Sequence, residues 1–316
     1  YIRIYFIGMP VVLLYNFGAA ILRAVGDTKR PLYFLFIAGI INVIFNLIFV
    51  IVFDLGVAGV AIATTMSQII SAVLVLSCLC KDQAVYRLHI RNVRLHKGKL
   101  LSILKIGLPA GFQGMMFNIS NMLVQSSVNS FGTTVMAGNT AGANVDSFLN
   151  TASVAVQQTA ISFISQNVGA GQFKRINRIL FGCLGLVVGI ELVLGLGGYG
   201  LAPVLLHIYS PDDEVVAYGI IRMSFIAAPY AVNGIQDCMA GALRGLGYSI
   251  APTAVALIAI CGFRILWLST IFRMEHSLPF LYMTYPISWI LAISGYIFFY
   301  VKAQRRLKAL KSPSGN

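Results

Sequence analysis

Apolar residues fill nine long stretches of the chain, and each stretch is close to the length that a helix needs to cross a bilayer. Such a helix takes about 20 mostly apolar residues. Short segments with Gly, Pro or Asp separate the stretches, as is typical of helix ends. The pattern predicts an all-α polytopic membrane protein. Its nine expected spans are 2–24, 32–53, 57–80, 101–130, 134–166, 177–200, 216–243, 250–273 and 279–301.

The composition also indicates a bilayer protein. Hydrophobic residues make up 58% of the 316 residues, charged residues only 10%, and the mean hydropathy is +0.83. Five cysteines fall inside apolar stretches without the spacing of a zinc site. We therefore expect these cysteines to be small buried hydrophobic side chains, and we expect no metal centre and no cofactor.

Basic residues give the chain a net charge of +13, and their distribution explains it. Of the 23 Lys and Arg residues, 19 lie in alternate loops and in the C-terminal tail. This is the positive-inside pattern, which predicts that these loops and the C-terminus face the cytoplasm. We therefore expect a multi-pass protein of the inner, cytoplasmic membrane whose charge reflects its topology and not binding to nucleic acid.

The sequence contains an internal repeat. The segment IRIYFIGMP (2–10) matches IRMSFIAAP (221–229), and ILRAVGDTKRP (21–31) matches ALRGLGYSIAP (242–252). Both copies run in the same direction across the membrane, as in transporters built from parallel repeats. In the ALRGLGYSIAP turn, we expect Gly247 to end one helix and Pro252 to begin the next.

The repeat predicts two pseudo-symmetric six-helix bundles, the first of which is present only as its last three helices. Three spans precede the repeated helix in the second copy and none in the first, so we expect a truncated N-terminus. The expected parts are 1–80 from the first bundle, a basic connector at 81–100, the second bundle at 101–302 and a cytoplasmic tail at 303–316. The connector is expected to lie along lipid headgroups, with a lipid-specific or regulatory site as the alternative.

Several motifs, taken in order, resemble those of one transporter family. They are the LRGxG turns followed by Pro, IGLPAGFQGMM (106–116) and QNVGAGQ (166–172). Together with the six-plus-six symmetry they are similar to helices four to twelve of the multidrug and toxic compound extrusion (MATE) family. The resemblance implies a secondary transporter, which we expect to be monomeric. Lipid-linked oligosaccharide flippases of the same superfamily are the alternative.

Ionisable and amide side chains inside the spans are the candidate site, because they are costly in a bilayer unless they face a cavity or a partner. Tyr230, Asn233 and Asp237 share one helical face after Pro229, which permits a kink. This face can bind a proton, a small cation or a cationic solute, or it can bond to a neighbouring helix. The resemblance places Asn233 where one branch of the family has its coupling acid.

Two further spans carry polar stripes at helical spacing. One runs along 134–166 and the other along 101–130, and each is either a hydrogen-bonded seam between helices or a cavity lining. We favour a shared water-filled cavity. The first stripe contains Asn139, Asp146, Asn150, Ser153 and Gln157, and the second contains Asn118, Asn121, Gln125 and Asn129.

Three more charged residues lie within spans, and membrane ion pairs are expected for Glu191, Arg222 and Arg264. Their partners cannot be assigned from sequence. The four histidines lie in loops or at span ends, away from any acid within the bilayer, so no enzyme is expected.

The favoured function is multidrug efflux coupled to the antiport of a cation, H+ or Na+, by alternating access between the two bundles. No Walker A sequence is present to bind ATP. The 20 Phe, 14 Tyr and 10 Met residues favour small amphiphilic, cationic solutes, because such surfaces repack around varied ligands.

Overall fold

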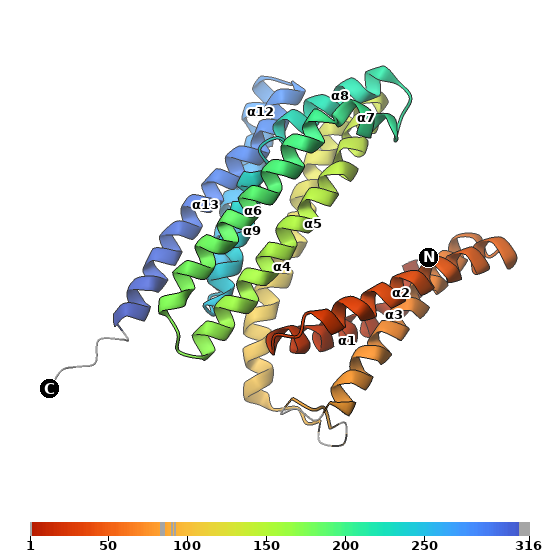
Figure 1. Cartoon of the computed structure of the whole chain (residues 1–316). Coiled ribbons are helices and arrows are strands. Elements are labelled where there is room, and N and C mark those ends of the chain that lie inside the picture. The colour runs from red at the N-terminus through yellow and green to blue at the C-terminus, as the bar shows by residue number, and fades with distance from the viewer. Residues whose placement is uncertain (1, 83–85, 90, 92, 310–316) are drawn as a thin grey trace. The chain divides into compact units, whose positions relative to one another are not determined.

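The computed structural model describes residues 2–82, 86–89, 91 and 93–309, and the regular elements of this part of the chain are helices (Figure 1). The predicted all-α membrane fold is confirmed. The chain forms two compact units, residues 1–96 and 97–316.

The first unit consists of three helices. They are α1 (Ile2–Ala24), α2 (Lys29–Leu47), which continues as a π-helical segment (Ile48–Val52), and α3 (Gly56–Lys81). Residues of α1 and α3 form its core, and Gly18 lets the two helices meet, since a Cβ at this position would lie 2.5 Å from Val75. The Tyr15 hydroxyl donates to the Pro31 carbonyl at 3.1 Å and ties α1 to the start of α2.

Polar contacts fix the beginning of the basic connector to the first unit. The Arg30 guanidinium donates to a carboxylate oxygen of Asp82 at 2.7 Å, and the Tyr86 hydroxyl donates to the same oxygen at 2.8 Å. Residues 83–85, 90 and 92 of the connector lie outside the described residues. The following helix begins at Lys97, within the stretch that was expected to be connector.

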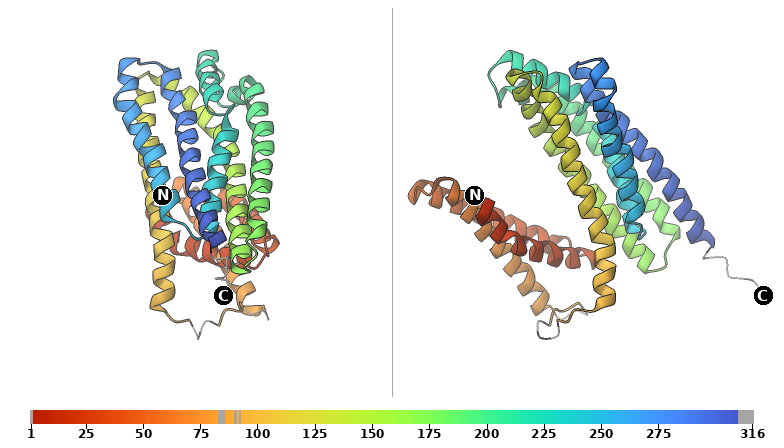
Figure 2. Two further views of the ribbon diagram at one scale, coloured as in Figure 1. Left: turned by 90° about the vertical axis from the view of Figure 1, so that its left-hand side faces the viewer. Right: turned by 180° about the vertical axis from the view of Figure 1, so that it is seen from behind.

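The second unit is a bundle of helices that run side by side, as both views of Figure 2 show. Its helices are α4 (Lys97–Asn129), α5 (Thr133–Gly169), α6 (Lys174–Gly200), α7 (Ala202–His207), α8 (Asp213–Phe225), α9 (Tyr230–Gly245), α10 (Ile250–Ala256), α11 (Phe263–Ser269), α12 (Ile271–Met274) and α13 (Leu278–Ala309). A π-helical segment (Leu257–Gly262) joins α10 to α11. The short helix α7 lies between the expected spans 177–200 and 216–243, where the apolar pattern predicts no helix.

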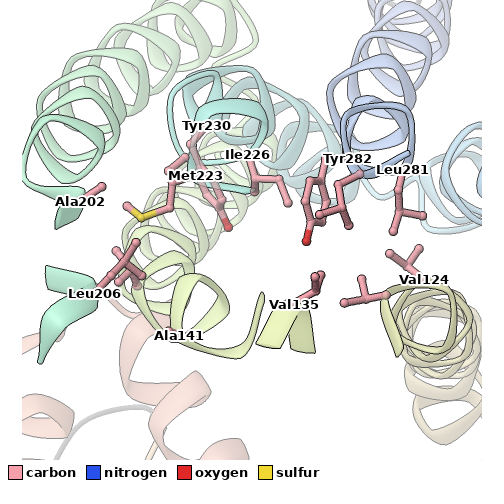
Figure 3. Close-up of a cluster of buried hydrophobic side chains, with 14 of the residues drawn as sticks. Val124, Val135, Ala141, Ala202, Leu206, Met223, Ile226, Tyr230, Leu281 and Tyr282 are labelled. Atoms are coloured by element: carbon pink, nitrogen blue, oxygen red, sulfur yellow. The ribbon is translucent and has the colours of Figure 1, made fainter. Parts of the chain in front are cut away.

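Helix α5 is central to the second unit and packs against α6, α8 and α9. Two apolar clusters form the core, one towards each end of the bundle. Figure 3 shows the first of them, in which Met223 and Leu206 meet beside Tyr230. Glycines allow the closest crossings: a Cβ on Gly138 of α5 would lie 2.5 Å from the Val215 carbonyl oxygen of α8.

Helices α8 and α9 form one bent span. They diverge by 48° at the segment between Phe225 and Tyr230, which contains Pro229. Pro229 has no N–H to donate, and the Ala228 N–H bonds five residues back to the Met223 carbonyl at 3.0 Å. The bend rests on α6, where a Cβ on Gly195 would lie 2.5 Å from the Ala227 carbonyl oxygen. The structure thus has the kink that the sequence permits.

Among the described residues, seven helices are long and apolar enough to cross a membrane, or eight if the bent pair α8 and α9 counts as one span. The one remaining expected span, 134–166, is a continuous helix, α5, but among the described helices it is not counted as apolar enough to cross a membrane. The reason is its stripe of Asn, Gln, Ser and Asp residues, which lowers its mean hydropathy.

The repeated turns have the same backbone geometry in both units. Gly26 and Gly247 both lie in the left-handed region, with φ of 93° and 86°. The N–H of Asp27 bonds to the Leu22 carbonyl at 2.9 Å, and that of Tyr248 bonds to the Leu243 carbonyl at 3.0 Å. Each turn is therefore a Schellman cap. The predicted role of Gly247 as the residue that ends its helix is confirmed.

Gly247→Ala is expected to destabilise the second unit by about 1–2 kcal/mol, because a side chain with a Cβ is strained in the left-handed region. Thermal unfolding of the purified chain in detergent measures the effect. Gly247→Asn is the matched variant and should cost less, since Asn tolerates this conformation. Equal losses for Ala and Asn would contradict the conformational explanation.

Candidate functional site

A buried ion pair joins the first polar stripe to the bent span. Arg222 of α8 donates to a carboxylate oxygen of Asp146 of α5 at 2.6 Å, and each side chain is only 9% exposed. A second guanidinium nitrogen donates to the Asn139 amide oxygen at 3.0 Å. Gly142 makes room for this arginine, because a Cβ there would lie 2.9 Å from its Cδ. The charge of Asp146 is therefore compensated within the protein.

Asn139 is the centre of a network that extends from this ion pair to two other helices. Its amide nitrogen donates to Gln125 of α4 at 2.8 Å, and its amide oxygen also accepts from the Tyr282 hydroxyl of α13 at 3.1 Å. Gln125 donates in turn to Asn129 at 3.0 Å. This part of the two polar stripes is a hydrogen-bonded seam that joins α4, α5, α8 and α13.

Tyr230 is the first residue of α9 after the bend. Its side chain is 5% exposed and lies within hydrogen-bonding reach of Asn150 on α5. Its ring packs edge-on against Trp289 of α13, with the ring centroids 5.8 Å apart. Figure 3 shows Tyr230 and Tyr282 among the apolar side chains of the first core cluster.

Asp237 lies two turns after Tyr230 and is half-buried among amides. Gln236 donates to one of its carboxylate oxygens at 3.0 Å, and Asn233 donates to the other at 3.4 Å. Gln157 of α5 donates to the Asp237 backbone carbonyl at 3.2 Å. Within the described residues Asp237 forms no ion pair. Its hydrogen-bond donors are amides, and Arg244, two turns further along α9, is close enough to interact with its charge but does not contact it.

Glu191 and Arg264 differ from the expectation of membrane ion pairs. Among the described residues neither Glu191 nor Arg264 pairs with an opposite charge. Arg222, the third residue for which an ion pair was expected, pairs with Asp146. Arg264 of α11 is 3% exposed, donates to the Asn121 amide oxygen of α4 at 3.0 Å and stacks over the Tyr285 ring at 4.2 Å. An aromatic face and an amide thus replace the carboxylate as partners of this cation.

A further polar cluster, which the sequence analysis did not identify, lies at the repeated turn of the second unit. The Gln113 amide oxygen on α4 accepts from Arg244 at 2.9 Å and from the Thr253 hydroxyl at 3.2 Å. Arg244 lies in the last turn of α9 and Thr253 in the first turn of α10, so Gln113 links both sides of the turn to α4. A glutamine within an apolar span was the available signal.

The described contacts do not bring Asn118 to these clusters; it is exposed on α4. The described residues contain no group of three or more His, Cys, Asp and Glu that could hold a metal ion. The arrangement is therefore a set of buried polar clusters between helices, of which only those at Asp237 and Glu191 hold an acid without a cation partner.

A multi-pass helical bundle with a bent span and buried polar clusters is the architecture of a membrane transporter. Solved structures of other proteins have a similar fold. The Vibrio cholerae MATE transporter VcmN in its bent form matches with a TM-score of 0.80 at 22% identity over 95% of this chain and 68% of that one. An outward-facing multidrug resistance MATE transporter matches with a TM-score of 0.84 at 18% identity, over 98% and 69%. These likenesses show the fold.

Sequence comparison gives the family. The MatE family model matches residues 109–268, and the chain belongs to this family. A model described as Lipid II flippase MurJ matches residues 1–132.

Two relatives illustrate the similarity. "Probable multidrug resistance protein YpnP" of Bacillus subtilis is 31% identical over 82% of this chain and 58% of its own length. "Multidrug export protein MepA" of Staphylococcus aureus is 21% identical over 82% and 57%. The chain thus spans somewhat more than half the length of these relatives.

Proposed function

We propose that the protein exports small amphiphilic, cationic solutes across the cell membrane by antiport of a cation, H+ or Na+, and that Asp237 binds the coupling cation. Family membership supports the export function, as do relatives named as a probable multidrug resistance protein and a multidrug export protein. The basic loops and the C-terminus face the cytoplasm in this proposal, as the charge asymmetry favours.

The observation that carries the assignment is the environment of Asp237. Asp146 is neutralised by Arg222, whereas Asp237 has only amide partners and lies two turns beyond the bend at Pro229. An intramembrane acid without a fixed counter-ion is suited to bind and release a proton or a small cation. Since α9 adjoins the bend, uptake of a cation there can favour one angle between α8 and α9 over another.

The test is transport by the full-length gene product in proteoliposomes. We expect a pH or sodium gradient to drive movement of a cationic dye, and Asp237→Asn to reduce it more than tenfold. Asp213→Asn is the matched control, because Asp213 lies at the start of α8 and its side chain is 96% exposed. Dye movement that follows neither gradient, or an Asp237→Asn variant with full activity, would refute the proposal.

The match of residues 1–132 to the MurJ model favours a second candidate, the movement of a lipid-linked sugar. A carrier for such a pyrophosphate needs uncommitted Arg or Lys side chains in its cavity. In the second unit the intramembrane Arg222 and Arg264 contact Asp146 and Tyr285, and Arg244 near the end of α9 contacts Gln113, which makes this function the weaker candidate. Movement of a lipid-linked sugar without dye transport in the same vesicles would make this function the stronger candidate.

A further inference from the structure

Glu191 lies at the junction of three helices in the interior of the second unit. It belongs to α6, its exposed fraction is 0%, and α6 packs against α5 and α9 at this level. The Ser153 hydroxyl of α5 donates to one carboxyl oxygen at 2.6 Å. On α9, Gly234 leaves the space for the side chain, because a Cβ there would lie 3.2 Å from Cγ of Glu191.

The second carboxyl oxygen of Glu191 is buried without a hydrogen-bond partner in the described structure. A buried carboxylate that keeps its charge generally accepts several hydrogen bonds or pairs with a cation. Glu191 has one hydroxyl donor. Ionisation in this surrounding is therefore strongly disfavoured.

Among the described residues no cation of the neighbouring helices pairs with Glu191. The charged groups of α5 and α8 are Asp146 and Arg222, which pair with each other, and the acids Asp213 and Glu214 in the first turn of α8. On α9, Arg244 donates to the neutral amide of Gln113 and lies ten residues beyond Gly234, the residue beside Glu191, which is about 15 Å along the helix. The basic residue of α7 is His207, whose ring contacts the Pro203 carbonyl oxygen and Asp213.

The remaining charged groups also disfavour an ionised Glu191. On α6 itself the basic residues are at positions 174, 175 and 178, and the nearest of them is 13 residues away, or about 20 Å along the helix. Asp237 on α9 is close enough to interact electrostatically with Glu191, and its charge is of the same sign. Tyr230, between the acids, contributes only a neutral hydroxyl.

We infer that Glu191 is a proton-binding site, distinct from Asp237, and that it holds its proton in the conformation described. The carboxyl is neutral while α5, α6 and α9 are packed together. Release of the proton requires this junction to open and admit water, which would solvate the charge. The role of this site in transport rests on the proposed function, but the bound proton itself does not.

Infrared difference spectroscopy of the purified chain in detergent tests the inference without any transport measurement. We expect the carbonyl stretching band of a protonated carboxyl to persist at neutral pH in the unaltered chain. Glu191→Gln should remove this band, whereas Asp237→Asn, the matched variant of the neighbouring acid, should retain it. A spectrum in which Glu191→Gln changes no carboxyl band at any pH would overturn the inference.

A second variant keeps the test decisive if Glu191→Gln does not fold. Ser153→Ala removes the one hydroxyl donor but leaves the carboxyl, so the band should remain and move to higher wavenumber as its hydrogen bond is lost. An unmoved band, or carboxylate bands in its place, would count against the site. Because these readouts are spectroscopic, their failure is distinguishable from a failure of Asp237→Asn to affect transport.

Thermal unfolding gives an independent readout. A proton that the folded chain retains and the unfolded chain releases makes stability fall as pH rises above about 4.3, the ordinary pKa of glutamate. Glu191→Gln cannot lose a proton, so its stability should depend less on pH than that of the unaltered chain. An equal dependence for both would overturn the inference.

Discussion

Arg222→Met is expected to destabilise the second unit by roughly 3–5 kcal/mol, because it leaves Asp146 as a buried charge without a partner. The two side chains are each 9% exposed, so water cannot replace the guanidinium. The variant also removes a donor from Asn139, the centre of the seam that joins α4, α5, α8 and α13. Thermal unfolding of the purified chain in detergent measures the loss.

Two controls separate the ion pair from a general effect of losing an arginine. Arg273→Met removes an exposed positive charge and should change stability by about 0.5 kcal/mol or less. The double variant Asp146→Asn with Arg222→Met removes both charges and should recover much of the loss. A double variant as unstable as Arg222→Met alone would show that the uncompensated carboxylate is not the cause.

Gly138→Ala is expected to separate α5 from α8 and to destabilise the bundle by about 1–3 kcal/mol, the usual cost of overpacking. The added Cβ would lie 2.5 Å from the Val215 carbonyl oxygen and 2.9 Å from the Gly219 nitrogen. Both are backbone atoms, so no side-chain rotation relieves the overlap and α8 itself must shift. Unfolding in detergent again provides the measurement.

Gly185→Ala is the matched control for this prediction. Gly185 lies in α6, and a Cβ there meets nothing within 4 Å. Replacement of a glycine inside an open stretch of helix by alanine stabilises by about 0.5–1 kcal/mol. Opposite signs for the two substitutions are therefore expected, and a stable Gly138→Ala variant would contradict the close crossing of α5 and α8.

Much of the fold could be predicted from sequence because the information is local. Runs of apolar residues locate the helices, and the repeated turns specify Gly26 and Gly247 as helix ends in both units. The proline at position 229 signals a break, although the sequence gives neither its angle nor its packing on α6. The helix α7 was missed because six residues are too few to show a hydrophobic period.

The partners of the buried polar residues could not be predicted, because they come from helices far apart in sequence. Arg222 and Asp146 are separated by 76 positions, and Glu191 and Ser153 by 38. Helical spacing shows which residues share a face but not which helix that face meets. Arg222 does form a membrane ion pair, with Asp146, whereas Arg264 contacts the Tyr285 ring and the Asn121 amide instead.

The two copies of the repeat place a proline at the same point, with different outcomes. Pro10 lies inside α1, which continues without a break, whereas the corresponding Pro229 separates α8 from α9. A continuous helix transmits a rotation along its whole length, but a divided one does not. Helix α9 can therefore rotate at the bend and carry Asp237 with it, while Arg222 on α8 remains paired with Asp146. In the first unit the corresponding helix, α1, is unbroken and would have to move as one rigid body.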